Sequence, residues 1–329
     1  MSNISITTIG RRGALTKIFK EELNKIGAKV IVTDKSPLAP ALYEADKYCL
    51  TPGITDDNYI ETILKICEEE DIKAIIPLLE QSFPVFNQAR DLIDEKGIIL
   101  LLSSAEIIEL CKDKYRLYQY FREKGIPVPE TFLPEELRQN YGDLPYPLFI
   151  KPRKGQGSQN SRKINTEEEL KFYIKTMEDI IIQEYLAGDE YTIDTLSDLE
   201  GRVLSAVPRK RLEVRAGEVS KAVTVRNDML IELAVRVIED LGIIGPANLQ
   251  AKVLPGGEIK LIEVNPRFGG GVPLSYQAGV NYPLLIYKML KGEKIEPFIG
   301  EFQDGLVMLR YDTAVFMNIK DLEKKDNCL

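Results

Sequence analysis

Carboxylate, amide and guanidinium groups gather in one short stretch of the C-terminal half. Glu263 and Asn265 stand two residues apart in a segment whose apolar alternation predicts a strand, so both side chains point to one face. Gln250 lies in an earlier segment of the same kind, and residues 255–258 (Pro-Gly-Gly-Glu) predict a hairpin turn between them. One carboxylate and two amides on one face suit a hard cation such as Mg²⁺, which also keeps water and phosphate oxygens as ligands.

Arg267 follows this segment, and three consecutive glycines, residues 269–271, come next. A guanidinium at this position is placed to hold a transferring phosphoryl group. The glycines either let the backbone approach a ligand closely or make a simple turn. A bare Glu-x-Asn pair fits a solvated strand end better than a site. Gln250, Arg267 and the glycines together favour a metal-phosphate site.

A second candidate segment begins where residues 148–152 predict a buried strand. Lys151 in that strand has the reach to contact a phosphate, and the loop with Gly155, Gly157 and Ser158 exposes N–H groups to phosphate oxygens. The loop has neither the GK[ST] of a Walker A sequence nor a GxGxxG fingerprint. Taken alone, it fits a mobile polar turn equally well.

The third candidate segment joins two stretches of different strand pattern. Such a hinge offers backbone hydrogen bonds to an adenine edge and a carboxylate to ribose hydroxyls. An ordinary interdomain turn with surface acids is the simpler interpretation of this segment by itself. The residues concerned are Gln183, Glu184, Tyr185, Leu186 and Glu190.

These residues need elements that position them, and the first hundred residues predict a parallel, doubly wound α/β domain. Short β-branched apolar runs alternate there with helical patterns, as in sheets buried on both faces. Strands are expected at 4–9, 29–33, 73–78 and 98–102, and helices at 15–26, 58–70 and 81–96.

The remainder predicts an α+β arrangement that becomes strand-rich and antiparallel after Glu190. Ser104 is expected to cap a helix, and a glycine and two prolines at 125–129 predict an extended linker. Helices are expected at 111–124, 166–176, 228–241 and 282–290, and strands at 148–152, 180–184, 191–196, 202–207, 247–254 and 259–264. The predicted domains are 1–103, 104–187 and 188–329.

Three motifs, in this order, resemble the ATP-grasp superfamily. They are Phe-Ile-Lys-Pro at 149–152, Gln-Glu-Tyr-Leu-x-Gly-x-Glu-Tyr at 183–191, and Asn-x-Gln at 248–250 followed by Ile-Glu-Val-Asn-Pro-Arg at 262–267. The nearest likeness is to the carbamoyl-phosphate synthetase large-subunit type, including its short single-unit relatives. The resemblance covers about residues 104–310, and the preceding sheet is similar to the family's pre-ATP-grasp domain. The loop after Lys151 departs from the more glycine-dense family loop.

The resemblance implies ATP bound between two α+β subdomains. It places Lys114 and Lys151 on phosphates, Glu184 and Leu186 on the adenine, and Glu190 on the ribose. It also implies that Arg267 stabilises the transferring γ-phosphoryl. Mg²⁺ (or Mn²⁺) would be held by Gln250, Glu263 and Asn265.

Basic residues elsewhere are candidates for binding a substrate anion in this acidic protein. They are Arg209, Arg211 and Lys221, expected in a loop between two strands, and Arg310. A solvated hairpin explains the first three equally well. Residues 10–13 (Gly-Arg-Arg-Gly) follow a predicted strand and could cradle an anion, and Glu80 follows another strand at its carboxyl end.

Composition narrows the chemistry further. The chain has 329 residues, a formal net charge of −8 and no histidine, which excludes Ser-His-Asp and Cys-His catalysis and histidine-ligated zinc. The negative charge disfavours a nucleic-acid partner, and no apolar run is long enough to span a membrane. The four scattered cysteines predict free thiols and a cytoplasmic location.

The function predicted is an ATP-dependent ligase that activates a carboxylate as an acyl-phosphate for attack by an amine. Small-molecule acids and amines are the expected partners, and homodimerisation is an expectation for the class. One alternative is phosphorylation of bicarbonate or carbamate as in carbamoyl-phosphate synthetase, although the chain has room for one ATP-grasp unit only. The other alternative is a non-catalytic ATP-binding regulatory module. A biotin-carboxylase role is disfavoured because no carrier-like region is visible.

Overall fold

The computed structural model describes residues 2–137, 141–155, 160–215, 217–322 and 328. Its N-terminal part is a five-stranded parallel sheet of order β3-β2-β1-β4-β5, which confirms the predicted α/β class. Central strands form from β-branched residues that are buried on both faces. The strands are β1 (Asn3–Thr7), β2 (Val30–Asp34), β3 (Lys47–Leu50), β4 (Ile72–Pro77) and β5 (Ile99–Leu100).

The helices of this domain differ from the expectation in one place. A single helix was expected over 81–96, but the chain turns at Ala89, where ψ is 6°, and forms two short helices instead. Edge strand β3 was not predicted, because its half-buried residues lack a continuous apolar run. The helical elements are α1 (Gly13–Lys25), η1 (Pro40–Glu44), α2 (Tyr59–Glu69), η2 (Glu80–Ser82), α3 (Phe83–Gln88) and α4 (Arg90–Glu95).

Two helices connect this domain to the rest. Ser104 caps α5 (Ala105–Lys112) by accepting from the Ile107 N–H, as expected. The predicted helix over 111–124 is interrupted at Asp113, whose carboxylate caps α6 (Lys114–Glu123). Leu117 and Phe121 of α6 pack in the core of the C-terminal sheet, whereas its Tyr115 and Tyr118 pack against Ile181 of the sheet that contains Lys151.

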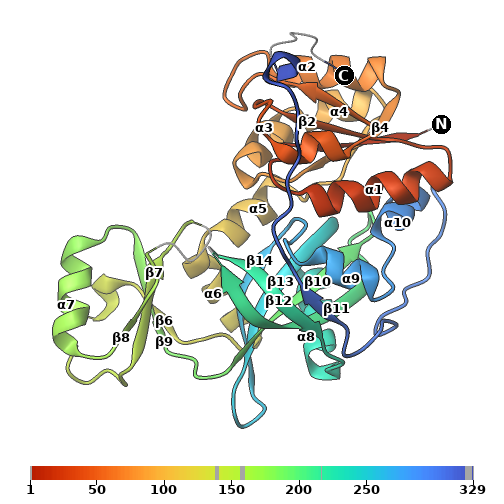
Figure 1. The fold of residues 1–329 in the computed structure, drawn as a ribbon. Helices are drawn as coiled ribbons and strands as arrows, with labels where there is room; N and C mark the ends of the chain where they lie inside the picture. The colour runs from red at the N-terminus through yellow and green to blue at the C-terminus, as the bar shows by residue number, and fades with distance from the viewer. Residues whose placement is uncertain (1, 138–140, 156–159, 216, 323–327, 329) are drawn as a thin grey trace.

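A four-stranded antiparallel sheet of order β6-β9-β7-β8 carries the Lys151 segment. Helix α7 (Glu167–Thr176), capped by Thr166, covers its core through the buried Leu170. This layer stands apart from the other two sheets in Figure 1. Its elements are β6 (Thr131–Phe132), η3 (Pro134–Leu137), β7 (Leu148–Pro152), β8 (Arg162–Ile164) and β9 (Ile180–Glu184).

The C-terminal sheet has six antiparallel strands in the order β14-β13-β10-β11-β12-β15. Helix α8 (Asp228–Leu241) packs its apolar face on this sheet. The expectation that Arg209 to Lys221 form a loop was wrong, because two strands continue their antiparallel pairing through it, from Arg209 opposite Thr224 to Arg215 opposite Glu218. The strands are β10 (Asp189–Ser197), β11 (Val203–Arg215), β12 (Glu218–Thr224), β13 (Gly245–Val253), β14 (Ile259–Asn265) and β15 (Val307–Leu309).

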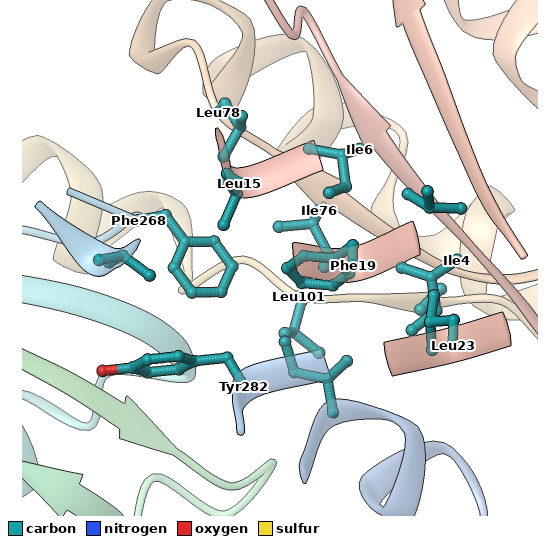
Figure 2. Packing of buried hydrophobic residues seen from close by; sticks show 14 of the residues in the cluster. Ile4, Ile6, Leu15, Phe19, Leu23, Ile76, Leu78, Leu101, Phe268 and Tyr282 are labelled. Atoms are coloured by element: carbon teal, nitrogen blue, oxygen red, sulfur yellow. The ribbon is translucent and has the colours of Figure 1, made fainter. Parts of the chain in front are cut away.

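A shared apolar core joins the first domain to the C-terminal sheet. Phe268 meets the Phe19 ring edge-on with centroids 5.9 Å apart. It also meets the Tyr282 ring edge-on, with centroids 5.6 Å apart. Figure 2 shows these rings beside Leu15 of α1 and residues of the parallel sheet. The packing fixes the glycine segment after Arg267 against the first domain. The remaining helices are α9 (Val272–Gln277), α10 (Tyr282–Leu290) and α11 (Ile319–Leu322).

The expectation of free thiols throughout was wrong for two of the four cysteines. Cys49 in β3 forms a disulfide with Cys328, 279 residues later, and the two also make an antiparallel bridge. Cys67 and Cys111 are free and buried, as expected. The sequence offered no CxxC spacing to indicate the pair, because the contact depends on the C-terminal segment returning to the first sheet (Figure 1). Among the described residues no helix is long and apolar enough to cross a bilayer.

Candidate active site

The predicted hairpin places the candidate metal ligands next to one another. Gln250 of β13 lies directly opposite Glu263 of β14, and Asn248 lies opposite Asn265. The Asn265 side-chain amide donates to Glu263 Oε1 at 3.1 Å and to Asn248 Oδ1 at 3.3 Å. Period-two alternation thus brings one carboxylate and several amides to one face of the sheet.

This donor set fits a magnesium ion that is also held by phosphate oxygens and water. Hard cations prefer carboxylate and amide oxygens, and Mg²⁺ in phosphate sites takes few protein ligands. The described residues contain no group of three or more acidic or cysteine side chains that could hold a metal ion. Glu263, Gln250 and Asn265 are the residues of this hairpin that could hold Mg²⁺.

Arg267 lies just beyond the hairpin and is fixed from two directions. Its Nε donates to Glu80 Oε1 at 2.7 Å, and its carbonyl accepts from the Asn248 side-chain amide at 3.0 Å. Glu80 begins η2, directly after the carboxyl end of β4 and its short extension. The first domain therefore orients the guanidinium that the sequence predicts to face the phosphoryl group.

Lys151 of β7 reaches the same region from the four-stranded sheet. Its side chain is buried, and burial lowers the pKa of the ammonium to about 8, although the nearby Glu263 carboxylate opposes that change. Lys114 at the start of α6 donates to the Gly155 carbonyl at 2.8 Å. Burial also lowers the Lys114 pKa, again against the attraction of Glu263. Both ammonium groups are thus placed where phosphate oxygens could accept from them.

The start of α6 is held by a contact that the sequence did not indicate. Arg153 forms a two-point salt bridge with Asp113 at 2.8 and 2.7 Å, and the same carboxylate caps α6. This contact fixes Lys114 relative to β7. Gly155 adopts a φ of +129°, a conformation that favours glycine. The predicted phosphate contacts of Gly157 and Ser158 lie outside the described residues.

A cavity of about 640 Å³ lies between the four-stranded and six-stranded sheets. Tyr185 is one wall of it, with the Lys163 ammonium 4.5 Å from its ring centroid. The Leu186 carbonyl accepts from Lys252 at 3.0 Å. The volume of this cavity suits a nucleotide-sized ligand. The predicted nucleotide residues on its lining are Lys114, Lys151, Gly155, Gln183, Glu184, Tyr185, Leu186 and Glu190.

Several of these side chains already have protein partners. The Gln183 amide donates to Thr131 Oγ1 at 2.7 Å, and Glu184 accepts from the Lys260 ammonium. Glu190 pairs with Arg211, whose Nη1 also lies 3.4 Å from Gln250 Oε1. Protein partners therefore hold the side chains of Gln183, Glu184 and Glu190, and Tyr185 lines the cavity beside them.

A second cavity of about 810 Å³ lies between the first domain and the C-terminal sheet. Arg12, Glu80, Arg267 and Gly270 line it and do not line the smaller cavity. The two cavities meet at a common wall. The residues that line both are Lys114, Gly155, Arg211, Gly217, Gln250 and Glu263.

The four predicted substrate-binding residues are placed differently. Arg209 and Arg211 line the larger cavity, but Arg209 is buried in a two-point salt bridge with Asp194. Arg310 lies beside that cavity and donates to Glu218 at 3.1 Å. Lys221 lines neither cavity and instead pairs with Glu213 at 2.7 Å.

Two family models match separate stretches of the chain. Residues 4–101 match the family described as PylC-like, N-terminal domain. Residues 176–312 match the family described as ATP-grasp in the biosynthetic pathway with Ter operon, and that stretch contains the whole candidate metal hairpin. Over its C-terminal part the chain is therefore similar to ATP-grasp proteins.

Curated relatives of the chain include large chains of carbamoyl phosphate synthase. The arginine-specific chain of Geobacillus stearothermophilus is 28% identical over 267 residues, which are 77% of this chain and 25% of the relative. The chain of Thermoanaerobacter sp. (strain X514) is 26% identical over 283 residues, 80% of this chain and 26% of the relative. The chain thus spans about a quarter of the length of these relatives.

Solved structures share the fold of the chain over about nine-tenths of its length. The biotin carboxylase domain of Hydrogenobacter thermophilus 2-oxoglutarate carboxylase, a dimer in complex with MgADP, ADP and bicarbonate, is 18% identical with a TM-score of 0.73. It is matched over 92% of this chain and 73% of that one. N5-carboxyaminoimidazole ribonucleotide synthetase of Thermotoga maritima is 21% identical with a TM-score of 0.67, over 90% and 78% of the two chains.

Proposed function

We propose that this chain is an ATP- and Mg²⁺-dependent ligase that joins a carboxylic acid to an amine through an acyl-phosphate. One observation supports this most directly. The nucleotide-sized cavity and the larger cavity share a wall that contains Gln250 and Glu263. A ligand in each cavity would meet at that wall, which is what transfer of a phosphoryl group between them requires.

The first step is attack of a carboxylate oxygen of the acid on the γ-phosphorus of ATP. The new P–O bond forms as the bond to the β-phosphate oxygen breaks, and ADP leaves. Lys151 and Lys114 hold phosphate oxygens, and Arg267 neutralises charge on the transferring group. Mg²⁺, when bound at Glu263, Gln250 and Asn265, adds charge neutralisation on the phosphates.

The second step joins the amine. Its nitrogen lone pair attacks the acyl carbon, the C–O bond to phosphate breaks, and inorganic phosphate leaves. The nitrogen loses a proton as the amide forms. Arg267 and the backbone of the glycine segment lie on the wall of the cavity where this phosphate departs. Both steps need positioning and electrostatics more than a titrating base near pH 7, in line with a chain that has no histidine.

Phosphorylation of bicarbonate is the second candidate, favoured by the likeness to carbamoyl phosphate synthase. A cavity of about 810 Å³ is much larger than bicarbonate needs, which favours a larger acid. A non-catalytic ATP-binding module is less favoured. Such a module needs no arginine anchored beside the metal hairpin, as Arg267 is by Glu80.

The proposal extends to three finer points. Mn²⁺ would replace Mg²⁺ at the hairpin, since both take oxygen ligands. A homodimer is proposed because a structural relative is described as a dimer, and light scattering tests it.

A cytoplasmic location agrees with the free thiols of Cys67 and Cys111, while the Cys49–Cys328 disulfide stands against a strongly reducing compartment. Thiol counts on protein alkylated at lysis decide that point.

An ADP-release screen with pairs of acids and amines, bicarbonate included, tests the function. We expect release that requires both an acid and an amine, and its loss in Glu263→Gln and Arg267→Ala. Release with bicarbonate alone would favour the second candidate. ATP binding without release across the panel, or normal turnover in Glu263→Gln, would overturn the ligase assignment.

A further inference from the structure

An arginine of the first domain faces the larger cavity without a full set of partners. Arg12 precedes α1 in the loop after β1, within the segment that the sequence marked as a possible anion cradle. Its Nη1 lies 3.4 Å from Glu218 Oε1 in an ion pair, but this buried atom makes no hydrogen bond within the protein. A buried guanidinium N–H without an acceptor is costly unless a ligand supplies one.

Two other arginines lie close to the ion pair of Arg12 and Glu218. Arg310 donates to Glu218 Oε2 at 3.1 Å and to the Val219 carbonyl at 2.9 Å. Arg267 lies near enough that its charge, with that of Arg310, adds to the effect of burial in lowering the Arg12 pKa. Repulsion among these guanidiniums is offset only partly by Glu218, whose own pKa is lowered by Arg12 and Arg310 against the effect of burial.

The local charges do not balance. Arg12, Arg267 and Arg310 bring three positive charges, and their partners Glu80 and Glu218 bring two negative ones. Helix α1, 13 residues long, adds its positive end here and has neither an acidic residue in its first turn nor a side-chain cap. An anionic ligand beside Arg12 would balance the site.

Arg12 is also held at one end of the larger cavity. A Cβ on Gly270 would lie 2.7 Å from its Nη1, so the glycine backbone packs directly against the guanidinium. Arg12 and Glu218 line only the larger cavity, whereas the reacting end of an acid must face Gln250 and Glu263 on the common wall. Arg267 is tied to the metal hairpin through Asn248, whereas Arg12 pairs with Glu218, so we assign to Arg12 a group distinct from the carboxylate that is phosphorylated.

We propose that Arg12, assisted by Arg310, binds a second anionic group of the acid substrate, which is therefore a dicarboxylic acid or a phosphorylated carboxylic acid. The inference rests on the proposed function and defines the substrate class of the same site. Arg12 acts in it as a specificity-determining residue. Carboxylate and phosphate share the property that a guanidinium recognises, namely paired acceptor oxygens with negative charge.

Calorimetric titration of the MgADP-bound protein with matched acids tests the inference directly. The pairs are succinate with succinamate, glutarate with glutaramate, and 3-phosphoglycerate with glycerate. In the wild type and in the control Lys17→Gln, where the altered lysine is exposed on α1 and pairs with Glu44, we expect at least one dianion to bind about tenfold or more tighter than its partner. The preferred pair tells a carboxylate from a phosphate. Arg12→Gln should abolish the preference.

Glu218→Gln is an independent test, because it should change the affinity for the dianion in the opposite direction. Removing the carboxylate that competes for Arg12 should tighten binding of the preferred dianion several-fold, so the inference stays testable if Arg12→Gln fails to fold. Equal binding of both members of every pair, or a preference that survives Arg12→Gln, would overturn it. If the enzyme turns over a singly charged acid, with a KM that Arg12→Gln does not change, the proposed second anionic group is overturned and the proposed ligase function still holds. Absence of turnover with every acid would contradict the ligase alone.

Discussion

Arg267 donates from Nε to Glu80 Oε1 over 2.7 Å, although 187 residues separate the two in the chain. Each side chain is mostly buried, with 17% and 20% of its surface exposed. The contact ties the arginine beside the metal hairpin to the carboxyl end of the parallel sheet. The orientation of the guanidinium therefore depends on how the first domain packs on the C-terminal sheet.

This contact predicts two graded losses of activity. Arg267→Ala should lower kcat by about 10²–10³-fold, as expected for removal of one group that stabilises transition-state charge. Glu80→Ala should lower kcat by about 10- to 100-fold through misplacement of the arginine, and Glu80→Gln should recover part of it. Steady-state ADP release is the measurement, with Glu106→Ala, an exposed glutamate on α5, as control. Unchanged kcat in Glu80→Ala would show that Arg267 needs no such anchor.

The lowered pKa of Lys151 predicts how nucleotide affinity depends on pH. Burial lowers this pKa to about 8, so the ammonium is charged below that pH and neutral above it in the free protein. Phosphates prefer the charged form, so the MgADP affinity should fall above pH 8 by up to about tenfold per pH unit for one linked proton. Calorimetric titration between pH 7 and 9.5 measures it.

A matched pair of variants separates Lys151 from its neighbour. Lys151→Arg keeps its charge throughout this range and should flatten the pH dependence, whereas Lys114→Arg should retain it. The same steep fall in Lys151→Arg would assign the titration to another group.

The packing of the glycine segment predicts a stability loss at Gly271. A Cβ there would overlap the Arg209 guanidinium, which cannot retreat because Asp194 holds it at 2.7 and 3.2 Å. The φ of Gly271 is −93°, so the expected loss of about 1–3 kcal/mol in Gly271→Ala is steric. Urea unfolding measures it. Gly256→Ala, in a turn with no atom within 4 Å, should stay within about 0.5 kcal/mol of the wild type. Equal stability of the two variants would contradict this packing.

The Cys49–Cys328 disulfide predicts a redox-dependent stability. Reduction should lower the free energy of unfolding by about 2–5 kcal/mol, because the bond closes a long loop with a sequence separation of 279 residues. Cys328→Ser should show the same loss and no further response to reductant. Thiol titration in denaturant should find two reactive thiols before reduction and four after it. Four thiols in protein prepared without reductant would exclude the bond.

Local patterns predicted much of this molecule. β-Branched runs indicated four of the five parallel strands, and the spacing of Gln250, Glu263 and Asn265 predicted the hairpin face on which they lie. Each of these inferences depends on periodicity within a single strand or between two strands joined by a short turn.

Features that depend on distant contacts were missed or misjudged. The sequence indicated Arg209 as a candidate for binding a substrate anion and gave no sign of its buried salt bridge with Asp194. The cysteines were expected to be free because their spacing carries no trace of a bridge between β3 and the far C-terminal segment. Glu80 was noted only for its place at a strand end, and its contact with Arg267 follows from the packing of two domains.

Oxygen transfer from the acid tests the central claim most directly. An acid substrate labelled with ¹⁸O in its reacting carboxylate passes one oxygen to phosphate if an acyl-phosphate forms. Mass spectrometry of the phosphate released with amine should find one ¹⁸O per turnover, and Glu263→Gln should release little phosphate of any kind. Unlabelled phosphate from a turning-over enzyme would contradict activation of the acid by phosphoryl transfer.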